Sequence, residues 1–451
     1  MKRTNTFSVR PLSTTGEQLL RDLLDASAAL WNETNYERLI RYDDEDGLEH
    51  EDVWDADTGS LEGQYKDVLG ASTAQQIIRK NSEAWRAFFR SKKKYHNESD
   101  ASVTEHPDPP GFWGNKDDGR KLHTVIRNTS YSIEWGDRSR LEILVGSELK
   151  DRYDHTGRLR LEIAGEPNWP EYERQGRLDL WYDETADTFR ASQPVTVSDD
   201  AQATPLADET AALDVGANNL VACTTTTGSQ YLYDGARPFE QFRATTERIA
   251  ELQSKLDDQR RTSKRIDGLY DVMYGRRDHA QDALVRDIVE RLYDEGVSAV
   301  YVGDIRDVLE THWMPEVNAK TYNFWAYRRF IDRLECVCEV HGIEVIEESE
   351  SWTTQECPEC GEREETERNG DVFHCVNCGF EGHADLKASQ LFLERETGME
   401  VGLMAQSVCL EWDDHAWSET SYSPVRASPE EERTDRSTRR TVGKVASVGS
   451  A

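Results

Sequence analysis

The 451-residue sequence lacks any run of about 18 consecutive apolar residues, which is roughly the length that a helix needs to cross a membrane. Its first residues, Met1–Asn5, also lack the apolar stretch of a signal peptide. No internal repeat is visible, so a solenoid or another repeat architecture is not indicated. We therefore expect a cytoplasmic protein without a membrane partner.

Basic residues are scarce. The chain has 54 Lys and Arg against 87 Asp and Glu, which gives a formal net charge of −33. Self-repulsion of this size destabilises a compact fold at low salt, but it is largely screened at molar salt, where the Debye length is about 3 Å. The composition therefore indicates a high-salt cytoplasm, such as that of a halophilic archaeon. It does not exclude nucleic acid, because a few basic grooves can remain on an acidic surface.

Cysteine is also used sparingly, and its spacing does not suggest disulfides. Four of the eight cysteines form two C-x-x-C pairs, Cys357/Cys360 and Cys375/Cys378, which fourteen residues separate. In an intracellular chain this spacing indicates metal binding. A glycine follows each pair and permits the tight turn of a zinc knuckle.

The metal that four thiolates prefer is a single tetrahedral Zn²⁺. Four protein ligands leave no open position for water, so we predict a structural zinc ribbon rather than a catalytic zinc site. An iron–sulfur cluster is the alternative for the same ligands. The other four cysteines lack such spacing and are expected to behave as small apolar residues; they are Cys223, Cys336, Cys338 and Cys409.

The first half of the chain combines helices with short strands. Apolar spacing predicts helices after residue 14 and over 71–90, preceded by a strand over 7–12. Segments of β type between polar turns then indicate a small β-domain; they are residues 121–126, 131–135, 141–144, 159–163 and 178–182. A Thr/Asp/Ala-rich linker follows, and we place a domain boundary after residue 208.

The second half shows the order of an RNase H-like α/β fold: three strands, a long helical stretch with a break near residues 260–265, a strand, a helix and a strand. The predicted segments are 211–215, 220–225, 230–233, 239–293, 299–302, 323–341 and 343–346. Residues 412–451 contain little apolar material and are expected to be disordered.

Three aspartates occupy the ends of predicted elements. Asp214 lies in the first strand of the second half, Asp304 ends the fourth strand, and Asp385 begins a helix just after the second cysteine pair. The first and fourth strands of an RNase H-like sheet are neighbours, and a final helix packs beside them. We therefore predict that these carboxylates hold two catalytic Mg²⁺ or Mn²⁺ ions. Each aspartate alone could equally be a helix cap or a solvated side chain.

Clusters of basic side chains are the candidate contacts to nucleic-acid phosphates. Each could instead be a solvated helix face. They are Lys92, Lys93 and Lys94; Arg260 and Arg261; Lys264 and Arg265; and Arg328 and Arg329.

Several of these motifs resemble the TnpB (OrfB) family of insertion-sequence proteins. The run Leu213–Val221 resembles its first RuvC motif, and His383–Ser389 resembles its third. The two cysteine pairs are similar to its zinc ribbon. In the first half, Ala74–Lys80 and Ala84–Arg90 are similar to its recognition-lobe helix. The resemblance covers roughly residues 7–395.

This resemblance implies a RuvC nuclease domain interrupted by the zinc ribbon, preceded by a wedge-like β-domain that carries a helical recognition insert. The expected partition is 1–208 for the β-domain with its insert, 209–356 and 379–411 for the RuvC-like domain, 357–378 for the ribbon, and 412–451 for the tail. The implied partners are a guide RNA from the transposon end and a double-stranded DNA target, which the guide selects by base pairing.

One position departs from the family pattern. The second RuvC motif usually carries a Glu where this chain has Gly303, and Asp304 comes next. In a regular strand, Asp304 would point to the opposite face, so we predict a bulge at residues 302–304 that turns its carboxylate toward Asp214.

Three functions remain open at this point. The chain is an RNA-guided DNA endonuclease, a nuclease-inactive relative that binds guide RNA and target DNA as a regulator, or a zinc-ribbon DNA-binding protein without a guide. The contexts of Asp214 and Asp385 disfavour the third, and Gly303 separates the first two.

Overall fold

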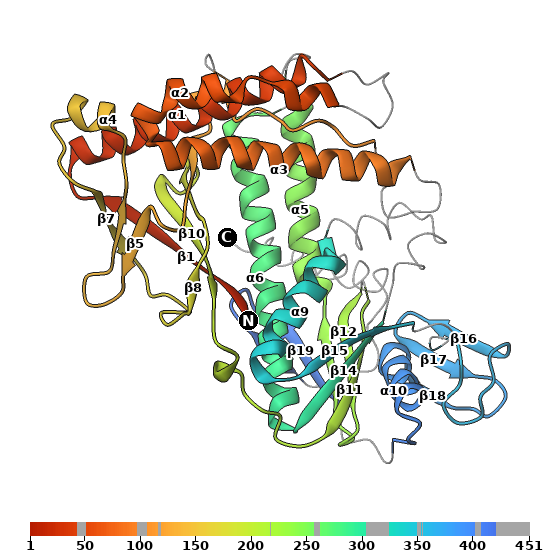
Figure 1. The fold of residues 1–451 in the computed structure, drawn as a ribbon. Helices are drawn as coiled ribbons and strands as arrows, with labels where there is room; N and C mark the ends of the chain where they lie inside the picture. Colours follow the sequence, from red (N-terminus) through yellow and green to blue (C-terminus); the bar gives the residue numbers. More distant parts are fainter. Residues whose placement is uncertain are drawn as a thin grey trace, which may run out of the picture. The chain divides into compact units, whose positions relative to one another are not determined.

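The computed structural model describes residues 1–42, 51–96, 106–115, 119–216, 218–256, 262–303, 324–349, 353, 355–401 and 407–420 (Figure 1). They form two compact units, Met1–Ala201 and Gln202–Ala451, and each unit has its own large hydrophobic core. Within the described ranges, no helix is both long and apolar enough to cross a membrane.

The first unit is built around an eight-stranded sheet in the order β4-β9-β10-β1-β7-β6-β5, with β8 beside β10. Strand β1 alternates between exposed and buried residues along its length, as expected for a strand with one face on a core. The strands are β1 Lys2–Pro11, β2 Gly114–Asn115, β3 Gly119–Arg120, β4 His123–Ile126, β5 Tyr131–Glu134, β6 Arg140–Ile143, β7 Leu159–Ala164, β8 Arg174–Gln175, β9 Leu178–Asp183 and β10 Thr188–Thr196. Strands β2 and β3 form a separate hairpin.

The helices of this unit lie mostly between β1 and β4 in the chain. They are α1 Thr14–Leu39, α2 Thr58–Leu69, α3 Ala71–Tyr95 and α4 Ser147–Arg152, with 3₁₀ turns at Glu51–Asp55 and Asp199–Ala201. A buried hydrogen-bond network joins α1 to α3: Trp85 Nε1 donates to Asn35 Oδ1 over 2.8 Å, and Arg38 donates to Asn81 Oδ1 over 2.7 Å. Buried hydrogen bonds between side chains of this kind fix how the two helices pack.

The second unit contains a seven-stranded sheet in the order β15-β14-β11-β12-β13-β19-β20. Its strands are β11 Glu209–Asp214, β12 Asn219–Thr225, β13 Gln230–Asp234, β14 Val297–Gly303, β15 Glu344–Glu348, β19 Val408–Trp412 and β20 Trp417–Thr420. Strands β11 to β13 are antiparallel, and β14 pairs in parallel with both β11 and β15. The predicted pairing of the first and fourth strands is therefore confirmed.

Helices α5 Ala236–Gln253, α6 Lys264–Asp294 and α9 Tyr327–His341 accompany this sheet. The expected helical stretch over 239–293, with its break near the basic cluster at 260–265, corresponds to two helices, because α5 ends at Gln253 and α6 begins at Lys264. Alternate residues of β11, Ala211 and Leu213, belong to the same core as Ile288 of α6 and Phe330 of α9. These helices thus cover one face of the sheet.

For residues 412–420 the expectation of disorder is wrong, because Trp417–Thr420 form β20, whereas residues 421–451 lie outside the described residues. Strand β19 pairs in parallel with β13, and β20 pairs with β19. Two tryptophans explain the order: Trp417 donates from Nε1 to the carbonyl of Ala280 over 3.0 Å, and its ring lies 5.5 Å from that of Trp412. The mainly polar composition of the tail concealed these two apolar anchors.

Between β15 and the last helix, the chain forms a small three-stranded sheet of β16 Thr366–Asn369, β17 Val372–Cys375 and β18 Glu381–His383. Helix α10 Ala384–Thr397 follows β18 directly and packs on the opposite face of the large sheet from α6 and α9 (Figure 1). Phe392 and Leu393 of α10 contact Ala212 of β11 there.

Candidate functional site

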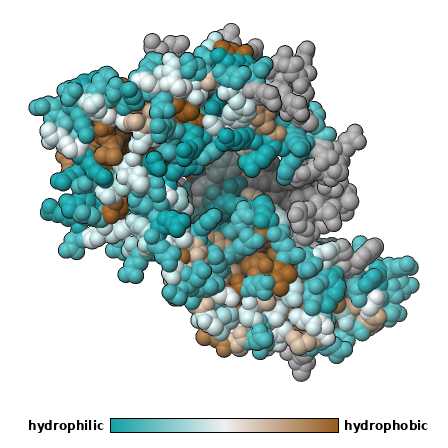
Figure 2. Space-filling view, viewed as in Figure 1, coloured by the Kyte–Doolittle hydropathy of each residue, from teal (hydrophilic) through white to brown (hydrophobic). Residues whose placement is uncertain are grey.

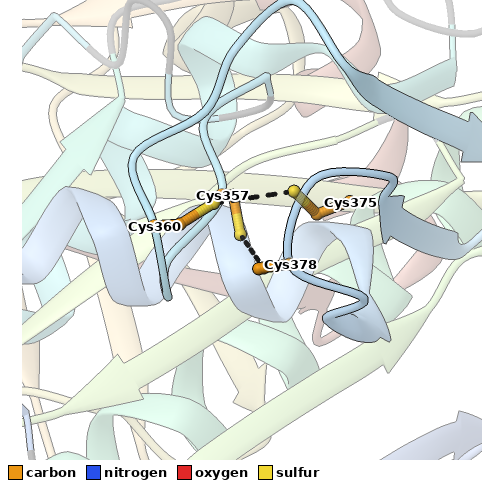
Figure 3. Close-up of side chains that lie close together, drawn as sticks. All are labelled: Cys357, Cys360, Cys375 and Cys378. Atoms are coloured by element: carbon orange, nitrogen blue, oxygen red, sulfur yellow. Dashed lines mark hydrogen bonds between the residues drawn. The ribbon is translucent and has the colours of Figure 1, made fainter.

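The four cysteines of the two C-x-x-C pairs converge on one point, as the sequence predicts (Figure 3). Their Sγ atoms all lie within 4.8 Å of one another, with 3.6 Å between Cys357 and Cys378 and 3.7 Å between Cys360 and Cys375. A tetrahedral zinc with bonds of roughly 2.3 Å to sulfur places neighbouring sulfurs about 3.8 Å apart. The spacing therefore fits one Zn²⁺ ion and is too tight for an iron–sulfur cluster.

The backbone of each pair turns in the same way. The N–H of Gly361 donates to the carbonyl of Cys357, and the N–H of Gly379 donates to that of Cys375, both over 2.9 Å. Both glycines have φ near +75°, at 71° and 79°, in the left-handed region that side chains with a Cβ avoid. The backbone N–H of Glu362 also lowers the pKa of Cys360 to about 7, which favours the thiolate that binds metal.

Asp214 lies at the end of β11, and its position along the strand determines which face of the sheet its side chain lies on. Side chains two residues apart on a strand point the same way. Ala212 contacts α10, so Asp214 belongs to the α10 face of the sheet, away from the α6 core. The charge of Asp214 also raises the pKa of Lys387 in α10, although burial is the larger effect there.

Asp385 is the second residue of α10, and its surroundings fix the start of that helix. The imidazole of His383 caps the helix by accepting, at Nδ1, from the backbone N–H groups of Asp385 and Leu386. One turn later, the Ser389 hydroxyl bonds that of Thr224 on β12 over 2.7 Å. Asp214 and Asp385 therefore lie on the same side of the sheet, on β11 and on the helix packed against it.

Both oxygens of the Asp385 carboxylate have a partner. Asn219 of β12 donates to Oδ2 over 2.8 Å, and Arg368 of β16 donates to Oδ1 over 2.7 Å. The side chain of Asp385 is only 12% exposed, so these contacts act where water screens charge weakly. The amide fixes the orientation of the carboxylate, and the guanidinium balances its charge.

Lys387 completes this end of α10. Its side chain is buried, and Nζ donates to the backbone carbonyls of Thr353 and Glu356, just before Cys357. Burial and, to a smaller extent, the charge of the nearby Arg368 together lower its pKa to about 8.

The second predicted carboxylate, Asp304, lies outside the described residues, so the predicted bulge at 302–304 stays a prediction. The strand before it is regular along β15, where Val302 pairs with Glu347 and Gly303 with Glu348. Val302 faces the α6 core and Tyr301 contacts the α10 side. Because side chains alternate along a strand, residue 303 lies on the same face as Tyr301, the face that α10 covers. This residue is a glycine, so it places no carboxylate on that face.

The predicted basic clusters differ in their surroundings. Lys92 is not at the surface: it is 2% exposed and donates to the Tyr42 hydroxyl over 3.0 Å, while Lys93 and Lys94 are exposed. The side chain of Lys92 turns inward, and its ammonium lies 5.2 Å from the centroid of the Tyr42 ring. A direct phosphate contact is therefore expected from Lys93 and Lys94 only.

In the second unit, Lys264 and Arg265 are exposed at the start of α6, and Arg260 and Arg261 lie outside the described residues. Arg328 pairs with Asp332 and Glu347. Arg329 pairs with two acidic side chains of α6, Asp278 and Asp282. These arginines join elements of the fold, whatever else they contact.

Comparisons with known proteins match this arrangement of elements. Residues 192–309 match the OrfB_IS605 model, described as a probable transposase, and residues 327–391 match the Cas12f1-like TNB domain. The TnpB-like protein ORF457 of Acidianus two-tailed virus is 27% identical over 434 residues, covering 89% of this chain and 88% of that protein. The chain is similar to TnpB-like proteins.

Two further matches are to CRISPR-associated proteins. The CRISPR-associated endodeoxyribonuclease Cas12f1 of Sulfoacidibacillus thermotolerans is 27% identical over 128 residues, which is 28% of this chain and 29% of that protein. A cryo-EM structure of a Cas12f1–sgRNA–target DNA complex matches the fold with a TM-score of 0.54 at 11% identity, over 86% of this chain and 98% of that one.

Each of the two segments that match a family model contains some of the residues of the candidate site. The transposase model contains Asp214, Asn219 and the position of Asp304, and the TNB model contains the cysteines, Arg368, Asp385 and Lys387. Sequence reasoning missed three of these residues. Asn219 lies within the run Leu213–Val221, where no role is predicted for it, and nothing in the local sequence links Arg368 to a carboxylate 17 residues away. A lysine among the apolar residues of α10 was a visible signal for Lys387.

Proposed function

We propose that this chain is an RNA-guided, divalent-metal-dependent DNA endonuclease associated with a transposable element. The observation that carries the proposal is the placement of Asp214 and Asp385 on one face of an RNase H-like sheet, next to a four-cysteine ribbon. A zinc ribbon alone is common among DNA-binding proteins, whereas paired carboxylates on this face serve metal-dependent phosphodiester chemistry.

In this proposal Asp214, Asp304 and Asp385 hold two Mg²⁺ or Mn²⁺ ions, which suit hard carboxylate ligands. Such ions activate the attacking water and stabilise the leaving oxygen. Asn219 keeps Oδ2 of Asp385 in place, and Arg368 has to release Oδ1 before a metal binds at that oxygen.

The proposed partners are a guide RNA from the transposon end and a double-stranded DNA target. Similarity to a TnpB-like protein along 89% of the chain supports them. Helix α3 supports them independently, because it carries seven basic residues and a single acidic one, Glu83, in a chain of net charge −33. Basic residues concentrated on one helix are typical of a contact to phosphates.

Gly303 favours a second candidate, a nuclease-inactive relative that binds guide and target without cutting. The α10 face of β14 ends at this glycine, where a metal site needs a carboxylate. If Asp304 does not turn toward Asp214, the site has two carboxylates, and guided binding persists without cleavage.

The test combines RNA sequencing with a cleavage assay. The protein is purified at high KCl, its copurifying RNA is sequenced, and duplex DNA matching that RNA is incubated with Mg²⁺ or Mn²⁺. We expect one enriched RNA and cleavage that EDTA abolishes. Asp214→Ala, Asp304→Ala and Asp385→Ala should each abolish cutting while target binding remains.

The matched control is Asp294→Ala, at an exposed aspartate near the end of α6. It should cleave like the unmodified protein. An enriched RNA with guided binding but no cleavage rejects the nuclease and leaves the inactive relative. No enriched RNA at all rejects both.

A further inference from the structure

The side chain of Lys387 connects α10 to the zinc ribbon in a way that packing alone does not require. It is 3% exposed, and its Nζ donates to the carbonyls of Thr353 over 2.8 Å and Glu356 over 2.9 Å. Glu356 directly precedes the first zinc ligand, Cys357. A buried ammonium without such acceptors is strongly unfavourable.

The same ammonium contacts the centre of the ribbon. Nζ lies 3.9 Å from the centroid of the Phe373 ring, a cation–π contact. Phe373 is buried in a small core with Cys357, Cys375 and Ala384, which is the first residue of α10. One lysine therefore touches the entry to the ribbon, its core, and the helix that carries Asp385.

These partners hold their positions only while the ribbon is folded, and structural zinc in such modules is coupled to folding. The backbone adds a second link, because the N–H of Ala384 donates to the carbonyl of Asp371 over 2.8 Å. If the ribbon loosens, Lys387 loses its acceptors and a buried charge is left unpaired at the start of α10, two residues from Asp385.

We propose that Lys387 is a positioning residue that couples zinc occupancy of the ribbon to the placement of the Asp385 carboxylate. The role of Asp385 in cleavage rests on the proposed function, but the coupling itself does not. A lysine that only fills space would stabilise the fold without linking zinc to α10.

The experiment compares Lys387→Met, which keeps the length of the side chain but removes its charge and donors, with the unmodified protein and with Lys255→Met. Lys255 is exposed and pairs with Glu251. Zinc transfer to a chelator dye is followed in each protein, together with hydrogen exchange of the 383–389 peptide before and after zinc removal. Guided cleavage is measured with zinc in excess.

In the unmodified protein and in Lys255→Met, removing zinc should raise exchange at 383–389. In Lys387→Met, zinc should transfer about tenfold faster, in the range seen for residues that orient metal ligands. Its 383–389 peptide should already exchange fast and respond little to zinc, and its cleavage should stay about tenfold lower in excess zinc while target affinity is unchanged.

Two results overturn the coupling. The first is that zinc removal from the unmodified protein leaves hydrogen exchange of the 383–389 peptide unchanged. This measurement does not depend on the folding of any variant. The other is Lys387→Met with unchanged zinc transfer and unchanged exchange. If the unmodified protein does not cleave, the proposed function fails, and the exchange and zinc measurements still decide the coupling.

Discussion

Asn219 shows how much a single amide determines at this site. It is the donor that fixes Oδ2 of Asp385, and it is almost fully buried. An amide neither adds nor removes charge, so it orients the carboxylate without weakening the pull of that carboxylate on a cation. Arg368, on the other oxygen, is a charged partner that competes with a metal.

Asn219→Ala should therefore lower the cleavage rate by about 10- to 100-fold, the usual cost of losing a residue that orients a metal ligand. Target affinity should not change, because the contact that this substitution removes is the hydrogen bond to the Asp385 carboxylate. Single-turnover cleavage and a filter-binding assay on the same preparation separate the two. Asn369→Ala, at an exposed position of β16, is the control. Equal cleavage by both variants would contradict the role of Asn219.

Single residues could be predicted from the sequence where a motif placed them. The cysteines and the contexts of Asp214 and Asp385 follow from local spacing. Asn219 and Arg368 do not, because their roles depend on Asp385, 166 and 17 residues away in the chain. The inward turn of Lys92 depends on Tyr42, 50 residues away, so it was equally hidden.

Among the elements, predicted strands such as 159–163 and 178–182 agree closely with β7 and β9, because alternating apolar residues fix a strand locally. Strand β10 was missed, although it pairs with β1 from Val9 to Lys2. Its buried positions include the polar residue Gln193, which bonds Asn5. The strand therefore lacks the simple alternation of apolar and polar residues that identifies a strand from sequence. The order of strands in a sheet comes from long-range pairing, which no local pattern contains.

Helix α3 carries an exposed basic stripe of Arg79, Arg86, Arg90, Lys93 and Lys94. Replacing Arg86 and Arg90 with Gln should weaken RNA binding. The slope of the logarithm of the RNA-binding constant against the logarithm of salt concentration should become less steep by about 2, because each phosphate contact releases roughly one counterion. The measurement is RNA affinity across a KCl series. Neutralising the exposed Arg127 and Arg138 instead should leave the slope in place. An unchanged slope for the α3 variant would remove the stripe from the interface.

The β19–β20 hairpin makes a prediction about stability. Trp417 is 7% exposed, lies 5.3 Å from the Tyr233 ring and donates to Ala280. Trp417→Ala should cost about 3–5 kcal/mol of the unfolding free energy of the second unit, as expected for a buried large-to-small change. Chemical denaturation at fixed KCl measures it. Trp54→Ala, at a half-exposed tryptophan of the first unit, is the control and should cost far less unfolding free energy. If Trp417→Ala costs no more than this control, the hairpin is only loosely attached to the second unit.

For the whole molecule, a charge of −33 predicts strong salt dependence. Raising KCl from 0.1 M to 1 M shortens the Debye length from about 10 Å to about 3 Å and screens the self-repulsion of the folded state. The melting temperature should therefore rise steadily over this range. Differential scanning calorimetry checks it, with sucrose at matched osmolality as the control for solvent exclusion. A flat melting temperature in KCl would contradict a high-salt adaptation.

The same salt weakens every phosphate contact, so stability and nucleic-acid binding respond to KCl in opposite directions. Under the proposed function, the concentration of basic residues on α3, in a chain rich in acids elsewhere, would keep a phosphate contact available at high salt. We expect guided activity to pass through a maximum in KCl rather than to rise with stability.

The placement of α10 after the ribbon also has a consequence for synthesis on the ribosome. Asp385 leaves the ribosome 171 residues after Asp214 (385 − 214), and the ribbon that anchors it emerges just before it. Strands β11 to β14 can pair, and α3 can fold, while the nascent chain still lacks the carboxylate that completes the site. Under the proposed function, a growing chain would thus acquire its proposed RNA-binding helix early and its proposed metal site late, so that RNA could bind before the chain can cut DNA.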